Sequence, residues 1–428
     1  MVQRSDATAA AMLSHLSPRD FAVVRDGRRT IVAVDPTEML VVDAADALTA
    51  LDDLGPGWWA GYLSYDLGRA IERVPTRSLP TALPDLVLAR FDARAVLDPR
   101  SAPRVVGTRP PADRLRDAVA ASAGAGWPEA EMRGPSGAEG AEATLRRLPV
   151  PELGPWETDL DRDEFAERVA TIIGRLEAGD CYQVNLTRRL HTPRTTDPIA
   201  LFAAVARRNP APHASALRLG DVHVVSASPE CFLRWQDGLV ETRPIKGTAP
   251  ATAGASLATS AKDRAENVMI VDLARNDLGR ICEPGSITVP SLCVPEEHPG
   301  LAHLVSTVRG RLRADIGAGD LVRATFPPAS VTGAPKPRVL EIIEELETVR
   351  RGVYCGAIGW IDTERRTGDL AVAIRTFVTT ADGTTFGVGA GIVADSDPIR
   401  EWEETELKAH RLIGAAGTAP PLLTANRS

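Results

Sequence analysis

The sequence predicts an α+β fold, in which several antiparallel strands are combined with single helices. Three apolar, strand-like runs follow one another between residues 351 and 396 with only turns between them, which is typical of an antiparallel meander. Segments with helical spacing occur singly among the other strands, whereas a parallel doubly wound sheet requires a helix after each strand. The chain of 428 residues is 44% hydrophobic and 25% charged, so it can bury a sizeable core.

The first 119 residues are expected to form an N-terminal region. Residues 28–36 and 84–98 are short β-rich runs, and residues 57–72 change from a strand-like to a helical pattern. A linker or surface loop is expected at residues 120–150, of which residues 120–143 are dominated by Ala, Gly, Pro, Ser and Glu. This composition buries little apolar surface, so it predicts a linker or a surface loop.

A second region covers residues 151–415 and is followed by a tail at residues 416–428. It begins with an expected amphipathic helix at residues 161–180, because apolar residues recur there every three or four positions and Gly179 can end the helix. These apolar residues are Phe165, Val169, Ile172, Ile173 and Leu176.

Residues 181–190 predict a strand with one polar face. Gln183, Asn185 and Thr187 alternate with apolar residues, so they share one side of the strand. That side either meets solvent or lines a polar cavity, and the sequence alone favours solvent.

The rest of the second region predicts a hairpin and three helices. The strand-like residues 221–235 and 239–250 are joined by a turn at Gly238. The expected helices cover residues 262–280, 335–347 and 397–416.

Charge and cysteine content limit the classes of function. The formal net charge of −8 argues against a general nucleic-acid binder, although a local basic pocket for an anionic substrate remains possible in an acidic protein. No apolar run is long enough to span a bilayer, and the first residues lack the apolar core of a signal peptide. The five cysteines form no C-x-x-C pair, so a reducing cytoplasm is the expected location.

Two of the expected helices carry acidic pairs. Asp263 and Glu266 share a face of one helix, as do Glu401 and Glu404 of the other, and Lys408 lies four residues beyond Glu404. Carboxylates from two helices that converge can hold Mg²⁺ together with an anionic substrate group. For each helix alone, a solvated face with an i,i+4 salt bridge is the favoured interpretation.

Three further features could belong to an anion-binding pocket. Gly389 and Gly391 lie in the run GVGAGIV, where backbone N–H groups can hold a carboxylate, although a tight sheet crossing explains the glycines equally. Arg375 lies inside an apolar, strand-like run, and a buried arginine requires an anionic partner. His303 fits a core histidine as well as a ligand contact.

Glu230 and Lys246 lie on either side of the expected hairpin and can approach each other. A lysine is a nucleophile only when it is deprotonated, and a nearby carboxyl group can act as a proton donor. By spacing alone, a cross-strand ion pair is the favoured interpretation.

Taken together, these segments resemble the chorismate-utilising enzymes, which include component I of the anthranilate and aminodeoxychorismate synthases and the isochorismate and salicylate synthases. The resemblance covers residues 160–412 in the family's order, and GYLSYDLGR near the N-terminus matches more loosely. The matching segments are GDCYQVNLTRR, SPECFLRW, TRPIKGTAP, KDRAENVMIVDLARNDLGR, HLVSTVRGRL, FPPASVTGAPKPRVLEIIEELE, RGVYCGAIGW, AVAIRTF, GVGAGIV and EWEETELKA.

The resemblance implies a fold, a cofactor and a set of site residues. The fold would be a large antiparallel α/β sandwich of two sheets with helices outside, and residues 151–415 would be the chorismate-binding region. Glu266 and Glu404 look like Mg²⁺ ligands, supported through water by Asp263 and Glu401. Glu230 looks like the acid that protonates the departing C4 hydroxyl of chorismate. The residues that look like substrate contacts are Arg375, Tyr354, Lys408, Gly389, Gly391, His303, Thr332 and Gln183.

Two positions distinguish the branches of the family. In the isochorismate and salicylate synthases a water-activating lysine takes the place of Gln183, and a neutral amide cannot act as that base. Anthranilate synthases resemble PIAGT at positions 244–248, whereas aminodeoxychorismate synthases resemble PIKGT, the form found here. In them the lysine, here Lys246, is thought to attack C2 of chorismate, and ammonia then attacks C4 and expels it.

The resemblance therefore implies the activity of aminodeoxychorismate synthase component I, for para-aminobenzoate and folate or for a secondary metabolite. The alternative is component I of an anthranilate or 2-amino-2-deoxyisochorismate synthase. A silent binding or regulatory subunit would also fit the fold, but the complete acidic set with Glu230 and Lys246 argues against it. No credible cysteine–histidine arrangement for a glutaminase is found, so ammonia is expected from a separate glutamine amidotransferase subunit.

Overall fold

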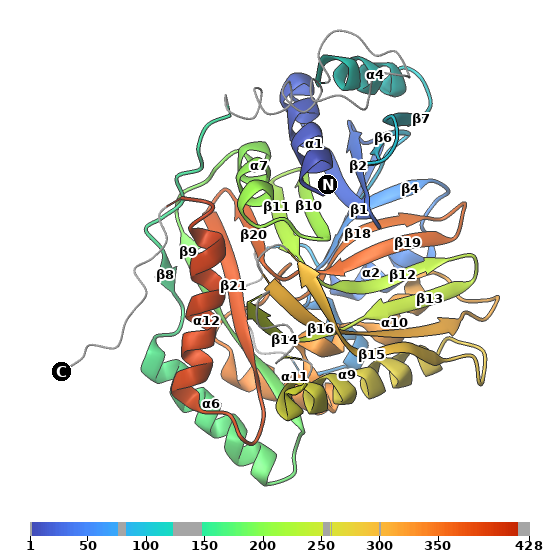
Figure 1. The fold of residues 1–428 in the computed structure, drawn as a ribbon. Helices are drawn as coiled ribbons and strands as arrows, with labels where there is room; N and C mark the ends of the chain where they lie inside the picture. Colours follow the sequence, from blue (N-terminus) through green and yellow to red (C-terminus); the bar gives the residue numbers. More distant parts are fainter. Residues whose placement is uncertain are drawn as a thin grey trace.

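The computed structural model describes residues 2–75, 83–122, 148–250, 257, 259–298 and 301–417. Two antiparallel sheets pack face to face, and helices cover their outer faces (Figure 1). The predicted α+β class, with two sheets and outer helices, is confirmed. Most of the expected linker and almost all of the expected tail lie outside the described residues.

The first sheet has 11 strands. Its order is β17 (Gly333–Ala334), β9 (Gln183–Thr192), β21 (Gly383–Ile392), β20 (Thr376–Thr380), β11 (Val222–Ser228), β10 (His213–Leu219), β1 (Phe21–Asp26), β2 (Arg29–Val34), β6 (Ala93–Leu97) and β7 (Arg104–Gly107), and β8 (Glu157–Thr158) pairs with β9.

The second sheet has 10 strands. Its order is β14 (Ile245–Pro250), β16 (Leu301–Arg311), β13 (Leu239–Arg243), β12 (Cys231–Gln236), β19 (Thr367–Val372), β18 (Ala357–Asp362), β4 (Trp58–Leu63), β5 (Leu86–Arg90) and β3 (Glu38–Val42), and β15 (Thr288–His298) pairs with β16. Both sheets thus contain strands from the N-terminal and from the C-terminal part of the chain.

The helices form two outer layers. Those on the first sheet are α1 (Val2–Leu16), α4 (Pro111–Ser122), α6 (Arg162–Glu177), α7 (Pro198–Arg208) and α12 (Pro398–Ile413). Those on the second sheet are α2 (Ala44–Asp52), α3 (Leu67–Glu72), α9 (Ala261–Gly279) and α10 (Ala318–Thr325), while α11 (Lys336–Leu346) contacts elements of both sheets and η2 (Ala329–Val331) precedes it.

The predicted boundaries of the helices follow from their capping residues. Asp161 caps α6 by accepting a hydrogen bond from the Glu164 amide, and the Glu164 side chain accepts in return from the Asp161 amide. The Asp397 side chain caps α12 by accepting hydrogen bonds from the Ile399 and Arg400 amides, and Pro398 occupies the first turn. The helices expected at residues 161–180, 262–280, 335–347 and 397–416 are all confirmed.

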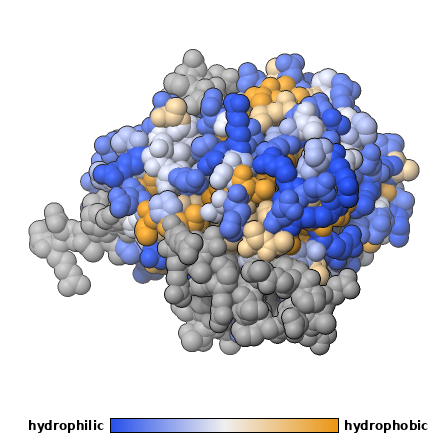
Figure 2. Space-filling view, turned by 90° about the horizontal axis from the view of Figure 1, so that it is seen from above, coloured by the Kyte–Doolittle hydropathy of each residue, from blue (hydrophilic) through white to orange (hydrophobic). Residues whose placement is uncertain are grey.

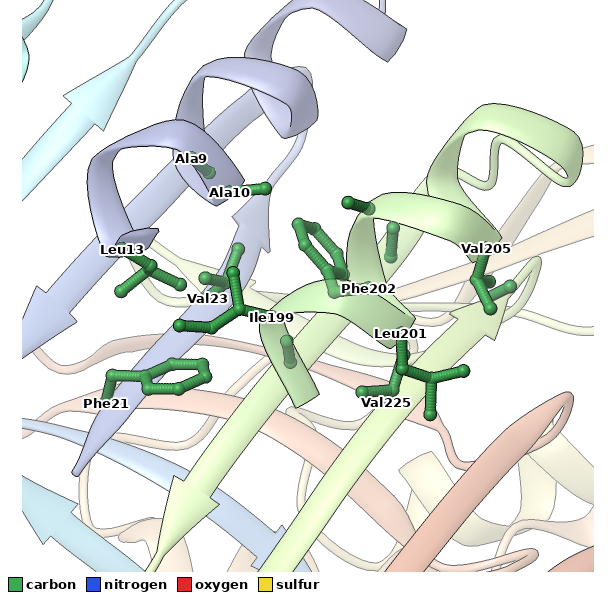
Figure 3. Close-up of a cluster of buried hydrophobic side chains, with 14 of the residues drawn as sticks. Ala9, Ala10, Leu13, Phe21, Val23, Ile199, Leu201, Phe202, Val205 and Val225 are labelled. Carbon is green, nitrogen blue, oxygen red and sulfur yellow. The ribbon is translucent and has the colours of Figure 1, made fainter. Parts of the chain in front are cut away.

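Apolar side chains fill the space on both sides of each sheet. Under α1 and α7, Phe21 of β1 and Phe202 of α7 belong to one cluster with Leu13 of α1 (Figure 3). Between the sheets, the Trp58 and Trp360 rings stack with centroids 6.1 Å apart. Burying a large apolar side chain contributes about 1.5–3 kcal/mol, so these apolar layers stabilise the packing of the two sheets against each other.

Two strand-like runs are divided between the sheets, which corrects the sequence-based prediction. The run at residues 221–235 becomes β11 in the first sheet and β12 in the second. The presumed meander is split in the same way, since β18 and β19 belong to the second sheet and β20 and β21 to the first. Local apolar patterning predicts a strand but not which of two stacked sheets it joins. The hairpin at Gly238 is confirmed, with Gln236 opposite Leu239.

The surface and the cysteines add two observations. Hydrophilic residues dominate the face seen from above, with apolar patches scattered among them (Figure 2). All five cysteines are free and buried. Among the described helices, none combines the length and the apolar character needed to cross a bilayer.

Candidate active site

Lys246 lies on β14, next to an irregularity in the sheet. It pairs with Leu304 of β16, and the register shifts between Lys246 and Thr248. Gly247 provides the shift with a φ of 73°, and a Cβ atom there would lie 2.9 Å from Asp263 Oδ1 of α9. The lysine is therefore on the strand that α9 covers.

The Lys246 ammonium is partly buried and donates to the backbone carbonyl of Ser330 at 3.1 Å. Burial lowers the pKa of Lys246 below its usual value, and the nearby Lys408 acts in the same direction, whereas Glu266 and Glu230 act to raise it. Among the described residues, no carboxylate is in ion-pair contact with this ammonium. The expected cross-strand ion pair with Glu230 is therefore not seen.

Glu230 occupies the point where the chain passes from β11 to β12 and hence from one sheet to the other. Its side chain is buried, with 4% of the residue exposed. Burial raises the pKa of Glu230 to about 7, although a hydrogen bond with Ser330 and the charges of Lys246 and Arg375 act to lower it. A carboxyl group in this state can give up a proton near neutral pH.

Arg375 occupies the matching crossing between β19 and β20. It has a φ of 54°, so it lies in a connection and not inside a strand as the sequence suggested. The two crossings are joined by hydrogen bonds, since the Ala227 amide donates to the Arg375 carbonyl and the Val372 amide donates to the Glu230 carbonyl. Burial lowers the pKa of Arg375 to about 10, and the charge of Arg411 adds to this, while Glu230 opposes it.

The polar face of β9 is buried, so the solvent-facing interpretation was wrong. Gln183, Asn185 and Thr187 are exposed by 0%, 8% and 5%. The opposite face of β9 packs under helices through Val184 and Leu186, so the polar residues point towards the other sheet. This burial follows from the stacking of the two sheets, which the strand's own sequence does not specify.

The glycines of β21 run beside this polar face. Gly389 pairs with Thr187 and Gly391 with Asn185. A Cβ atom on Gly391 would lie 2.6 Å from Gln183 Nε2 and 3.5 Å from Lys246 Nζ, so glycine keeps open the space where both nitrogens converge.

The acidic residues of α9 and α12 are close enough to shift each other's pKa values. Burial raises the pKa of Glu266, and Asp263 and Glu401 raise it further, against the charge of Lys246. Burial also raises the pKa of Glu401, which accepts a hydrogen bond from Ser396 at 2.7 Å. In the described part of the chain, no group of three or more metal-ligating side chains converges.

Glu404 has the opposite environment. Its carboxylate lies 2.6 Å from Lys408 Nζ, and this ion pair outweighs the effect of burial and lowers the pKa of Glu404. Lys408 also donates to the Gly389 carbonyl at 2.9 Å, so the predicted i,i+4 salt bridge links α12 to β21.

Three other predicted residues have partners in the interior. The Thr332 hydroxyl accepts a hydrogen bond from the Tyr65 hydroxyl at 3.2 Å. His303 is buried on β16, next to Leu304, which pairs with Lys246. The Tyr354 ring packs against Gly387 and lines a cavity with Thr187 that is separate from the small cavity beside Glu230.

Ser330 is a site residue that the sequence did not reveal. Its carbonyl accepts from Lys246, and its side chain forms a hydrogen bond with Glu230. It belongs to η2, within a segment without helical or strand periodicity, so no local signal identifies it.

Comparisons with known proteins agree with this architecture. The family profile described as chorismate binding enzyme matches residues 11–414. Aminodeoxychorismate synthase component 1 of Klebsiella aerogenes is 39% identical over 363 residues, which cover 82% of this chain and 76% of that protein. Anthranilate synthase component 1 1 of Haloarcula marismortui is 38% identical over 371 residues, or 84% of this chain and 76% of that protein.

A solved structure extends the comparison to the fold. Anthranilate synthase component I from Streptococcus pneumoniae TIGR4 matches with a TM-score of 0.70 and 28% identity, over 90% of this chain and 92% of that one. The chain thus belongs to the chorismate-binding enzymes and is a chorismate-utilising enzyme.

Proposed function

We propose that this enzyme is component I of an aminodeoxychorismate synthase, which converts chorismate and ammonia to 4-amino-4-deoxychorismate. The observation that carries the proposal is that Lys246 and Glu230 meet at the same residue, since the Lys246 ammonium donates to the Ser330 carbonyl at 3.1 Å and the Ser330 side chain is hydrogen-bonded with Glu230. Burial lowers the pKa of Lys246 and raises the pKa of Glu230 to about 7. A lysine with a lowered pKa supplies more of its nucleophilic form, and a carboxyl group with a raised pKa supplies more of its acid form. Relatives named aminodeoxychorismate synthase component 1 support it.

The proposed reaction has two steps. First, the neutral amine of Lys246 bonds to C2 of chorismate while the C4–O bond breaks, and Glu230 protonates the departing hydroxyl, which leaves as water. Second, the ammonia lone pair forms a bond to C4, and the bond from C2 to Lys246 breaks with its electrons returning to Nζ. The product leaves with an ammonium group, and Glu230 regains a proton from solvent. Because Lys246 occupies C2, the amine is placed on C4 and the enolpyruvyl group stays.

The remaining predicted residues would bind the two carboxylates and the ring of chorismate. The Arg375 guanidinium and the Lys408 ammonium supply positive charge, and the amides near Gly389 and Gly391 supply donors. His303 and Thr332 would complete the walls of the pocket, whereas Tyr354 lines the separate cavity beside Thr187.

The carboxylates of α9 and α12 are of the kind that Mg²⁺ prefers, since that cation takes a few carboxylates and keeps several waters. Among the described residues these side chains do not converge, so water would complete the coordination. Glu266 and Glu404 would hold the ion, with Asp263 and Glu401 supporting through water. When bound, the ion supplies positive charge for the ring carboxylate of chorismate.

Ammonia would come from a separate glutamine amidotransferase subunit in the cytoplasm, where the five free thiols stay reduced. The name component 1 carried by relatives supports a two-component enzyme. Purified chain supplied with glutamine alone is expected to show little turnover, and efficient use of glutamine contradicts the separate subunit.

The identity of the product tests the proposal. The protein is incubated with chorismate, Mg²⁺ and an ammonium salt, and the product is identified by mass spectrometry and NMR. We expect 4-amino-4-deoxychorismate, whereas a product aminated at C2 contradicts the assignment. Chorismate without ammonia is expected to leave an adduct on Lys246, detected by intact mass and located by peptide mapping.

The second candidate is component I of an anthranilate or 2-amino-2-deoxyisochorismate synthase, in which ammonia enters at C2. The similarity to anthranilate synthase components in both sequence and structure favours it. The same product assay distinguishes the two candidates.

A further inference from the structure

Tyr65 belongs to the segment GYLSYDLGR of the N-terminal region, which has no part in the proposed reaction. It follows β4, and only 1% of the residue is exposed. The Tyr65 amide and the Ser64 hydroxyl both donate to the Gly352 carbonyl, at 2.8 and 3.0 Å. The Asp66 carboxylate accepts from the Gly352 amide at 2.9 Å. The N-terminal region therefore fixes the backbone next to Arg351.

Arg351 is buried in the connection between α11 and β18, with 7% of the residue exposed. Its guanidinium donates to the two carboxylate oxygens of Glu347 at 2.7 and 2.9 Å. It also donates to the Val331 carbonyl at 2.8 Å and to the Asn185 carbonyl at 2.6 Å. The Tyr65 ring lies over it, with Arg351 Cζ 4.3 Å from the ring centroid. One planar group with several fixed donors thus links the end of α11 to η2 and β9.

The Tyr65 hydroxyl reaches the same segment at Thr332. The two hydroxyl oxygens lie 3.2 Å apart, and the Thr332 hydroxyl donates to the Pro328 carbonyl at 2.9 Å. Because Thr332 has a single hydroxyl proton and uses it on Pro328, the Tyr65 hydroxyl is the donor of the first bond. Val331 and Thr332 are thus both held by side chains from outside the proposed reaction centre.

Ser330 directly precedes these two residues and contacts both proposed reactive side chains. Its carbonyl accepts from Lys246 at 3.1 Å, and its side chain is hydrogen-bonded with Glu230. The Ser330 carbonyl and the Val331 nitrogen belong to one planar peptide unit. A shift of Val331 would therefore also move the carbonyl that Lys246 uses.

We propose that Tyr65 and Arg351 are positioning residues of the amination site, where they hold Ser330 in place. This inference rests on the proposed amination of chorismate. When the Lys246 amine donates one N–H to a fixed carbonyl, the directions open to its lone pair are restricted, so a fixed Ser330 aims the amine at the substrate. A loosely held Ser330 would leave the amine and the Glu230 acid present but misaligned.

A purely structural role is the alternative, because Arg351 and Glu347 form a buried ion pair. Such a role predicts a less stable protein in which the folded molecules react at the wild-type rate. Positioning predicts slower chemistry in folded protein, with little change in the affinity for substrate.

The sharpest test is Tyr65→Phe, which keeps the ring over Arg351 and removes only the hydroxyl bonded to Thr332. Adduct formation on Lys246 is followed by intact mass after mixing with chorismate alone. At saturating chorismate its rate should fall about 5-fold or more, while the chorismate concentration that gives half the maximal rate should stay within about 2-fold of wild type.

Tyr62→Phe is the matched control. Tyr62 lies three residues earlier and is also 1% exposed, but its hydroxyl makes no hydrogen bond among the described residues. Removing this hydroxyl should leave the rate of adduct formation near wild type.

Arg351→Lys tests the second positioning residue. It keeps a positive charge beside Glu347, but a single ammonium cannot hold all three partners of the planar guanidinium. The rate of adduct formation at saturating chorismate should fall about 10-fold or more. Combined with Tyr65→Phe, the loss should be smaller than the product of the two single losses, because both residues act through the same segment. Circular dichroism and a thermal melt confirm that each variant is folded at the assay temperature.

The outcomes separate positioning from the proposed function. Folded Tyr65→Phe and Arg351→Lys that form the adduct at the wild-type rate overturn the positioning role, and so does an equal loss in Tyr62→Phe. Wild-type enzyme that makes no C4-aminated product overturns the proposed function instead. In that case the effect of Tyr65→Phe can still be measured as kcat and the KM for chorismate, with whatever product the enzyme makes.

Discussion

Two lysines donate hydrogen bonds to backbone carbonyls of the same short segment, residues 325–330, but their environments differ. Lys336 is buried and donates to the Asp277 carboxylate and to the Thr325 carbonyl, both at 3.0 Å. Lys246 donates to the Ser330 carbonyl at 3.1 Å, and the described residues give it no ion pair. Both lysines thus use carbonyls of residues 325–330, and only one has a carboxylate in contact.

The difference fits a structural role for Lys336 and the proposed chemical role for Lys246. Lys336 and Asp277 are buried and lie 3.0 Å apart, so removing either partner would leave an uncompensated buried charge. An ammonium that is desolvated without such a contact loses its proton more readily, as the lowered pKa of Lys246 indicates. The missing ion pair therefore supports the proposed role of Lys246 as a nucleophile.

The largest expected effect follows from removing the unpaired lysine. Lys246→Ala should lower the rate of C4 amination by about 10³-fold or more, since the proposed covalent nucleophile is lost. The variant should unfold at a temperature near that of wild type, because no ion pair is broken. Product analysis by mass spectrometry and a thermal melt measure the two effects. C4 amination at the wild-type rate would contradict the covalent role.

Removing the paired lysine should act on stability instead. Lys336→Met leaves Asp277 buried without its partner, and breaking a buried ion pair costs about 3–5 kcal/mol in the free energy of unfolding. Urea denaturation at pH 7 measures the loss.

A double variant provides the control for this loss. Lys336→Met combined with Asp277→Asn removes both charges, so it should recover a large part of the stability. If Lys336→Met alone is as stable as wild type, the ion pair between Lys336 and Asp277 does not stabilise the fold. The proposed difference between the two lysines would then be wrong.

Sequence patterns predicted the helices and the hairpin because their signals are local. The apolar spacing of α6, its Asp161 cap and the turn at Gly238 are set by residues close together in the chain. The crossing points at Glu230 and Arg375 lack such a signal, since sheet membership depends on strands far away in the sequence. Pro229 can end a strand before Glu230, but it does not indicate that the chain changes sheet, and no proline precedes Arg375 in the run AVAIRTF.

The candidate site residues were assigned through resemblance more than through spacing, and their roles stay predictions. Local reasoning favoured an ion pair for Lys246 and solvent for the polar face of β9. Both interpretations failed because burial in the folded protein, which is a tertiary property, decides them: β9 belongs to the first sheet and the strand that carries Lys246 to the second. The i,i+4 pair of Glu404 and Lys408 was predictable, since helical geometry alone brings these residues together.

Glu230 offers a test of burial that does not depend on catalysis. Its pKa is raised from 4.5 to about 7, so the folded state binds the proton more tightly than the unfolded chain does. The resulting stability is fully present below about pH 4.5 and is lost as pH rises through 7. Glu230→Gln removes the ionisation, so relative to wild type it should gain about 3 kcal/mol in unfolding free energy between pH 4.5 and 8.5.

Urea denaturation at the two pH values measures this gain. Glu230→Gln should also lose most of its amination activity, because the amide cannot protonate the leaving hydroxyl. A stability difference that does not change with pH would show that Glu230 is not held in its acid form by burial.

A third lysine should give the smallest effect and complete the comparison. Lys408 makes an ion pair with Glu404 at 2.6 Å, but the two side chains are exposed by 46% and 52%. Water solvates both charges, so Lys408→Met should lower the free energy of unfolding by about 1 kcal/mol or less. Urea denaturation beside Lys336→Met measures the contrast. Equal losses in the two variants would show that contact with a carboxylate, and not the burial of that contact, determines how much each lysine stabilises the fold.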